Sequence, residues 1–181
     1  MKTCWQPLLC ASFAMAMSFD ANALTITPTN PALVPLTFTG PSGSQITDLV
    51  NGYLSSKYGD APDLTYKQDS SGLEEATLAS SYSTEFLSDA SWTITPSGPA
   101  LTGPVYLLVK DGNHSPYAYL FDLTSLWNGT EELVLSGFWP GQGSISHVSV
   151  YATDGGTTLM LLGIALVGFG AARRFLRVSL N

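Results

Sequence analysis

Apolar and polar side chains alternate along several short segments of the chain between residues 64 and 151. A period of two places every second side chain on the same face of a β-strand, and glycine and proline mark the turns between strands. Segments 64–68, 91–95 and 145–151 show this alternation, and segments 76–87, 105–110, 117–122 and 133–138 are short stretches rich in apolar residues that lie between turn residues. They predict a mainly β domain, a single antiparallel β-sandwich of jelly-roll-like organisation.

One stretch before these strands follows a helical period instead. Its apolar positions have the i, i+3, i+4, i+7, i+8 spacing, and they are Ile46, Leu49, Val50, Tyr53 and Leu54. We expect a short amphipathic helix over about residues 44–57, with this apolar face packed on a sheet. Ser42 or Ser44 can cap its start, and Gly59 fits the position after its end.

The segment 24–43 precedes this helix and is rich in proline. It opens with Leu24-Thr-Ile-Thr and contains Pro28, Pro31, Pro35 and Pro41. Because proline cannot donate a hydrogen bond to a β-ladder, we expect a short edge strand followed by extended chain.

Two hairpins are expected among the later strands. Asp111-Gly112-Asn113 separates the apolar segments 105–110 and 117–122, and Asp-Gly between apolar strands is a strong hairpin signal. The segments 133–138 and 145–151 flank a second turn, so we expect these last two strands to pair within one sheet. The predicted core residues are Leu107, Val109, Leu120, Val134, Phe138, Val148 and Val150.

Residues 1–23 have the organisation of a secretory signal peptide. Lys2 supplies the positive charge, residues 8–17 are the apolar region, and Ala21-Asn-Ala23 is a cleavage site with small residues. The exported domain should therefore begin near Leu24. Both cysteines of the chain lie inside this peptide, so the domain depends on packing rather than on disulfides.

The C-terminal segment has three parts in a fixed order. Residues 152–158 are small and polar, residues 159–172 form an uncharged apolar run (157–172 at most), and residues 173–181 are basic. A helix over residues 157–172 would be roughly 24 Å long, close to the span of a thin bilayer. Arg173, Arg174 and Arg177 then belong on the cytoplasmic side and stop translocation, which leaves residues 24–151 outside.

This layout resembles the PEP-CTERM sorting signal of bacterial proteins processed by exosortases. Thr153, Asp154, Gly155 and Gly156 stand where one variant has Pro-Asp-Gly-Gly, although Ala152-Thr153 replaces its Val-Pro. The blocks from about residue 106 to 151, including Phe138-Trp-Pro-Gly-Gln-Gly, are also similar to PEP-CTERM ectodomains. The resemblance implies a bacterial, exported β-domain with an exosortase as partner. It implies no activity for that domain.

Charge is unevenly distributed along the chain. Between Leu24 and Asp154 there are three lysines, no arginine and thirteen acidic residues. Such a surface repels nucleic acid and anionic lipid, so we expect no nucleic-acid partner. It suits an exported domain that stays soluble or that takes up divalent cations loosely.

The sequence has little that indicates catalysis. It lacks the Gly-x-Ser-x-Gly, His-Glu-x-x-His and phosphate-loop motifs, and its two histidines are His114 and His147. We expect no enzyme activity and no cofactor. Asp111 and Asn113 are a weak metal candidate, because with Ser115 and Asp122 they match four positions of a calcium loop. Pro116 replaces the glycine that such a loop needs for its turn.

The function predicted from the sequence is therefore that of an exported, exosortase-processed protein of the cell surface or extracellular matrix, first anchored in the inner membrane. The alternative is a carbohydrate-binding module that contacts exopolysaccharide. Tyr117, Tyr119, Trp127 and Trp139 could then stack on sugar rings, if they are exposed in a row. A calcium-binding structural domain and a secreted hydrolase are weaker alternatives.

Overall fold

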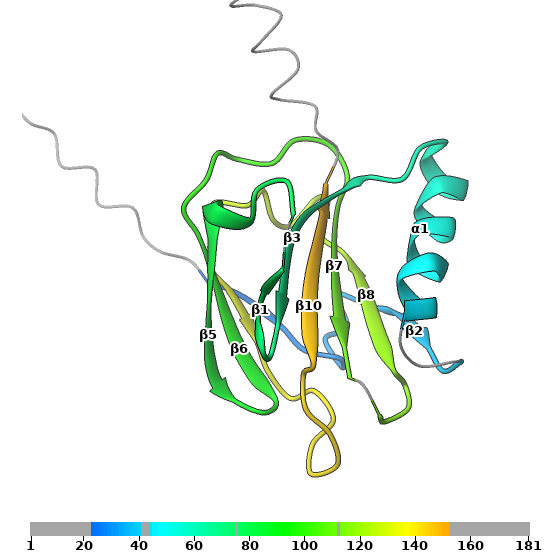
Figure 1. Cartoon of the computed structure of the whole chain (residues 1–181), viewed down its shortest axis with the longest axis vertical. Coiled ribbons are helices and arrows are strands. Elements are labelled where there is room, and N and C mark those ends of the chain that lie inside the picture. The colour runs from blue at the N-terminus through cyan, green and yellow to red at the C-terminus, as the bar shows by residue number, and fades with distance from the viewer. Residues whose placement is uncertain (1–22, 41–43, 75, 112, 153–181) are drawn as a thin grey trace, which may run out of the picture.

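The computed structural model describes residues 23–40, 44–74, 76–111 and 113–152, which form two β-sheets packed face to face and one α-helix (Figure 1). The four-stranded sheet has the order β1 (Leu24–Ile26), β9 (Leu133–Leu135), β6 (Ser91–Pro96), β5 (Tyr82–Ser88). The six-stranded sheet has the order β2 (Leu36–Phe38), β8 (Ala118–Asp122), β7 (Val105–Lys110), β10 (His147–Ala152), β3 (Asp63–Asp69), β4 (Gly72–Glu74). The prediction of a mainly β sandwich with one helix is confirmed at this level.

The main core lies between the two sheets. Alternate side chains of each strand enter it, as the pleat of a strand requires. From the six-stranded sheet they include Tyr66, Leu107, Val109, Phe121, Val148 and Val150, and from the other sheet Ile26, Trp92, Ile94, Leu133 and Leu135. Nearly all of these residues are fully buried, so this layer supplies most of the apolar burial of the domain.

Helix α1 (Ser44–Tyr58) covers the other face of the six-stranded sheet (Figure 1). Its buried residues Ile46, Val50 and Leu54 pack on Tyr106 and Leu108 of β7 and on side chains of β8 and β10. With a layer on each face, β7 and β10 are buried at every position. β7 therefore reads as an almost continuous apolar run, whereas β10 also buries the polar residues His147 and Ser149.

The predicted apolar face of α1 is only partly correct. Leu49 and Tyr53 were expected to pack on the sheet, but they are 48% and 38% exposed. Each precedes a buried residue by one position and is rotated by about 100° around the helix axis from it. The contact with the sheet is thus a narrow stripe of every fourth residue. The helix ends as predicted, because Gly59 has φ +88° and donates its N–H to Ser55 O at 2.8 Å.

The expected pairing of the last two strands is wrong. β9 pairs with β1 in parallel and with β6 in antiparallel fashion, whereas β10 lies in the other sheet between β3 and β7. The segment 136–146 between them crosses from one sheet to the other. Gly137, Trp139 and Gly141 have positive φ values of 70°, 43° and 76°, which turn the backbone along this crossing.

Val134 does not belong to the core, although it was predicted there. Its neighbours Leu133 and Leu135 point between the sheets and are fully buried, so Val134 lies half-buried on the outer face of the four-stranded sheet. The other predicted core residues are buried, with Leu120 in the layer beneath α1.

Three local expectations need smaller corrections. The strands 105–110 and 117–122 do form an antiparallel pair, but β8 starts at Ala118 and the connection 111–117 is a long loop, with a cis peptide bond between Ser115 and Pro116. The proline-rich segment contains the strand β2, which was not predicted. The strand expected over 76–87 begins only at Tyr82, after a 3₁₀ turn over Ala79–Ser81.

Among the described residues, the first strand is β1, which begins at Leu24, and the last is β10, which includes Ala152. Ala152 was predicted to open the linker, but it is buried and paired with Asp63 and Val105. In the part of the chain that the structure describes, no helix is long and apolar enough to cross a membrane. The predicted signal peptide, apart from its last residue, and the predicted C-terminal helix lie outside the described residues.

Candidate functional site

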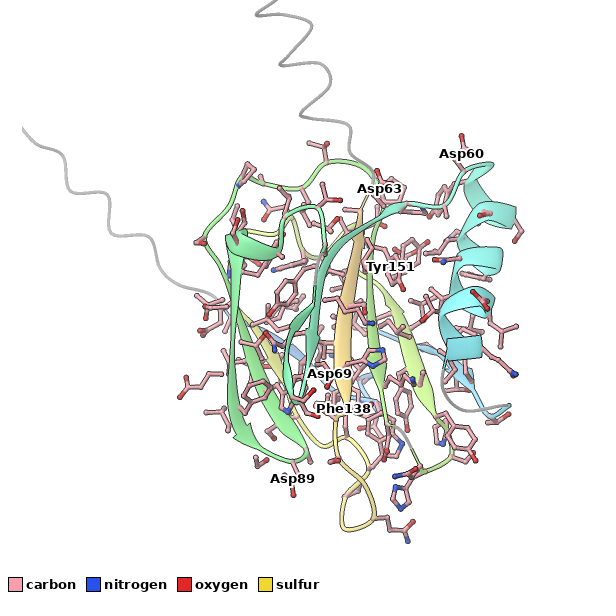
Figure 2. The ribbon with its side chains drawn as sticks, viewed as in Figure 1. Asp60, Asp63, Asp69, Asp89, Phe138 and Tyr151 are labelled. Carbon is pink, nitrogen blue, oxygen red and sulfur yellow. The ribbon has the colours of Figure 1, made fainter. Side chains whose placement is uncertain are left out.

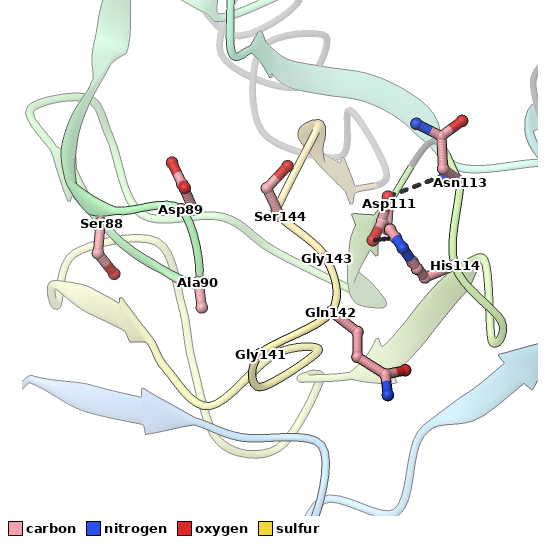
Figure 3. Close-up of a pocket in the computed structure, with 10 residues that line it drawn as sticks. All are labelled: Ser88, Asp89, Ala90, Asp111, Asn113, His114, Gly141, Gln142, Gly143 and Ser144. Atoms are coloured by element: carbon pink, nitrogen blue, oxygen red, sulfur yellow. Dashed lines mark hydrogen bonds and ion pairs between the residues drawn. The ribbon is translucent and has the colours of Figure 1, made fainter.

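Three loops meet at one end of the sandwich and line an open pocket of about 600 Å³, which we call the end pocket (Figure 3). The loops are the β5–β6 turn around Asp89, the β7–β8 loop 111–117 and the crossing segment 136–146. The lining residues are Ser88, Asp89, Ala90, Asp111, Asn113, His114, Gly141, Gln142, Gly143 and Ser144. Most of them are polar, and they come from three separate parts of the chain.

Hydrogen bonds between backbone groups fasten the three loops to one another. Ile145 donates its N–H to Asp89 O at 2.7 Å, and Ser146 donates its N–H to Lys110 O at the same distance. The indole Nε1 of Trp139 donates to Pro116 O, also at 2.7 Å. The crossing segment is thus held against both other loops, so the pocket is preformed.

Asp111 is the buried anchor of the pocket, with only 4% of its side chain exposed. Its Oδ1 accepts the N–H of Asn113 at 2.9 Å, and its Oδ2 lies 3.0 Å from Nδ1 of His114. The contact is a hydrogen bond in the tautomer that carries a proton on Nδ1 of His114, because the carboxylate oxygen accepts. The imidazole, 43% exposed, is therefore held in one orientation by Asp111.

Gly143 packs directly against this pair. A Cβ at this position would overlap Oδ2 of Asp111 and would lie 2.9 Å from Cβ of Trp139 and 3.0 Å from Nδ1 of His114. Any larger residue would push the crossing segment away from the β7–β8 loop. The close approach of the two loops therefore requires glycine here.

The weak calcium candidate is not assembled in the structure. Both oxygens of Asp111 already have partners, and Asn113 contributes its backbone N–H while its side chain is exposed. Asp122 lies in a different cluster, bonded to Lys57, Tyr106 and Thr124. Among the described residues, no group of three or more His, Cys, Asp or Glu side chains is placed to hold a metal ion.

That second cluster joins the C-terminal end of α1 to the sheet. Lys57 Nζ donates to Asp122 Oδ2 at 3.0 Å and to the hydroxyl of Tyr106, which itself donates to Asp122 at 2.8 Å. Burial opposes ionisation of Asp122, but hydrogen bonds from Thr124, Tyr106 and Lys57 outweigh it and lower its pKa to about 2. The pKa of Lys57 is raised by its bonds to Tyr106 and Asp122, and burial raises the pKa of Tyr106. All three groups titrate far from neutral pH, so the cluster is suited to fastening the helix rather than to proton transfer.

The four aromatic residues considered for sugar stacking do not form an exposed row. Trp127 and Trp139 are buried, and their indole N–H groups donate to Glu131 O and Pro116 O at 2.7 Å. Tyr119 is half-buried with its ring centroid 5.2 Å from that of Trp139, and Tyr117 packs beside the core under α1. Both tryptophans are buried and both tyrosines are only partly exposed, so the four rings form no exposed row.

The other predicted site residues lie outside the described part of the chain. They are the sorting residues Thr153, Asp154, Gly155 and Gly156 and the basic residues Arg173, Arg174 and Arg177. Conversely, the sequence reasoning missed Asp89, Gln142 and Ser144 of the end pocket. Only the glycine-rich stretch Gly141-Gln-Gly143 could have indicated a close approach of loops there.

Comparison with protein-family models, with curated proteins and with solved structures found no match for this chain.

Proposed function

We propose that this protein is exported, held in the inner membrane through its C-terminal segment, and processed there by an exosortase. The sandwich is then displayed at the cell surface or released into the extracellular matrix. The proposal is based on the order of signal peptide, domain, small polar motif, apolar run and basic end in the sequence.

The observation that carries this proposal is the motif Asp154-Gly155-Gly156, followed by an uncharged apolar run and three arginines. The strands that the structure describes, from β1 at Leu24 to β10 at Ala152, lie between the two predicted processing points.

The residues of the C-terminal segment have different roles in the proposed processing. Gly155 and Gly156 let a protease approach the backbone closely, and Asp154 supplies a charge just outside the membrane. Arg173, Arg174 and Arg177 stay on the cytoplasmic side. Cleavage falls at or near the bond between Asp154 and Gly155. The catalytic groups belong to the exosortase, so the proposal assigns the sandwich no enzyme activity.

The test is to express the full chain in bacteria with and without an exosortase and to weigh the mature protein by mass spectrometry. We expect a C-terminus near Asp154 in exosortase-positive cells only. The variant Asp154→Ala should slow this processing, while Asp48→Ala, a matched change on the exposed side of α1, should not. Recovery of surface-exposed protein that still ends at Asn181 in exosortase-positive cells would contradict the proposal.

Carbohydrate binding is retained as a second candidate function because of the end pocket. The pocket is open and lined mostly by polar residues, and its volume lies in the range of ligand sites. Carbohydrate binding at the end pocket does not require stacking on Tyr117, Tyr119, Trp127 or Trp139, because none of them lines the pocket.

A further inference from the structure

The end pocket lies at the opposite end of the sandwich from the end of the described chain. β10 starts at His147, beside the loops that form the pocket, and runs the length of the sheet to Ala152 (Figure 1). Under the proposed function, the segment after Ala152 leads to the membrane. The end pocket then faces away from the membrane, toward the surroundings of the cell.

The lining of the pocket determines which ligands it suits. Asp89 contributes an exposed carboxylate, Ser144 a hydroxyl and Gln142 an amide, and none of the lining residues is Lys, Arg or aromatic. In a domain with a large excess of acidic residues, such a surface repels phosphate, sulfate and uronate groups. A neutral ligand with many hydroxyls fits, because each hydroxyl can donate to a carboxylate and accept from an amide.

A cation is a poorer match to the same pocket. The most deeply buried carboxylate, that of Asp111, already accepts from Asn113 and is paired with His114. Its part is to hold the imidazole of His114, whose exposed edge remains available to a ligand. Asp89 lies on a different loop, across the pocket from this pair (Figure 3).

We propose that the end pocket binds a neutral saccharide through Asp89, Ser144 and His114, with Asp111 as the positioning residue for His114. The hydrogen bonds between the loops keep the pocket formed in the absence of a ligand, which lowers the entropic cost of binding. The binding chemistry is independent of the proposed sorting. Only the outward orientation of the pocket depends on it.

The test uses the full chain, labelled with ¹⁵N and purified in a detergent without a sugar headgroup. Methyl glucoside, methyl galactoside, cellobiose and dextran oligosaccharides are titrated in turn, and amide shifts are recorded. We expect saturable shifts confined to residues 88–90, 113–114 and 141–144. Asp89→Ala should weaken binding roughly tenfold or more, because it removes a hydrogen bond to a charged group.

Asp60→Ala is the matched control, since it removes the same charge at the far end of the domain (Figure 2). It should leave the affinity unchanged. Asp111→Asn should also weaken binding while Asp89 and Ser144 still respond, because only the orientation of His114 is disturbed.

Three results would overturn the proposal. These are the absence of shifts with every saccharide, shifts that saturate elsewhere on the domain, and shifts of the pocket residues with calcium chloride but with none of the sugars. No exosortase is present in this experiment. A failure of sorting would therefore leave its outcome untouched, and a failure of binding would leave the sorting proposal standing.

Discussion

Phe138 offers the sharpest test of the packing at the pocket end of the sandwich. Its side chain is completely buried in the main core, although it lies in the crossing segment and not in a strand. Its ring centroid lies 5.6 Å from that of Tyr119, 6.1 Å from Phe121 and 5.7 Å from Trp139. Phe138→Ala therefore removes a ring with three aromatic neighbours.

The expected loss of stability is large for a domain of this size. Truncation of a buried phenylalanine typically costs about 3–5 kcal/mol, since a cavity remains where the ring was. The total free energy of unfolding of such a domain is of the order of 5–15 kcal/mol. The loss corresponds to a fall in melting temperature of roughly 10–20 °C.

The measurement is urea denaturation of the full chain, followed by tryptophan fluorescence. Phe86→Ala is the control, because it makes the same substitution at a ring that is 48% exposed and whose centroid lies 4.6 Å from that of Trp92. We expect it to cost about 1 kcal/mol. Equal losses for the two variants would refute the assignment of Phe138 to the core.

Three further predictions follow from other contacts. Gly143→Ala should lower stability and shift the amide signals of Asp111 and His114, because the added Cβ collides with this pair; unchanged signals would show that the loops are not in contact. Asp122 is ionised in the folded state down to a pKa of about 2, below its unfolded value of about 3.9, so its contribution to stability is present above pH 4 and is lost between about pH 4 and pH 2. Asp122→Asn should reduce the steepness of acid unfolding in that window, as followed by circular dichroism. Inserting Gly-Ser-Gly-Ser after Ala152 should speed exosortase processing in a pulse-chase experiment, because Ala152 is paired on both sides and limits access to the next residues; an unchanged rate would contradict this.

Local patterns in the sequence were sufficient to identify the main elements. The alternation of 64–68 and 91–95 corresponds to strands within one or two residues, since period two reflects the pleat itself, and the apolar run 105–110 coincides with β7. Helix α1 and its end at Gly59 were predictable because capping and helical period depend on neighbours a few residues apart. The terminal processing segments are likewise a proposal from the sequence alone.

The phase of burial within a strand was harder to assign. Leu133-Val134-Leu135 is apolar throughout, so either alternate set can face the core. The structure buries both leucines, which removes more apolar surface from water than burying the single valine would.

The sheet to which each strand belongs was decided only by the tertiary structure. The segments 133–138 and 145–151 resemble a hairpin because turn residues separate them, yet β9 and β10 lie in opposite sheets. The connection between them carries Phe138, Trp139 and Ile145, all buried in the main core. Burial of these side chains favours a connection that crosses to the other sheet, and it disfavours a hairpin turn within one sheet. No short-range sequence pattern shows which of the two connections buries more apolar surface.

The end pocket, too, was decided only by the tertiary structure. Asp89, Asp111 and Ser144 come from three loops that are distant in the sequence, and they meet because β10 pairs with β7 and because Ile145 bonds to Asp89. The sequence by itself indicated the helix and most of the longer strands, but not β2. Only the long-range pairing of the strands decided which loops became neighbours, because that pairing depends on burial summed over the whole core and not on any one segment.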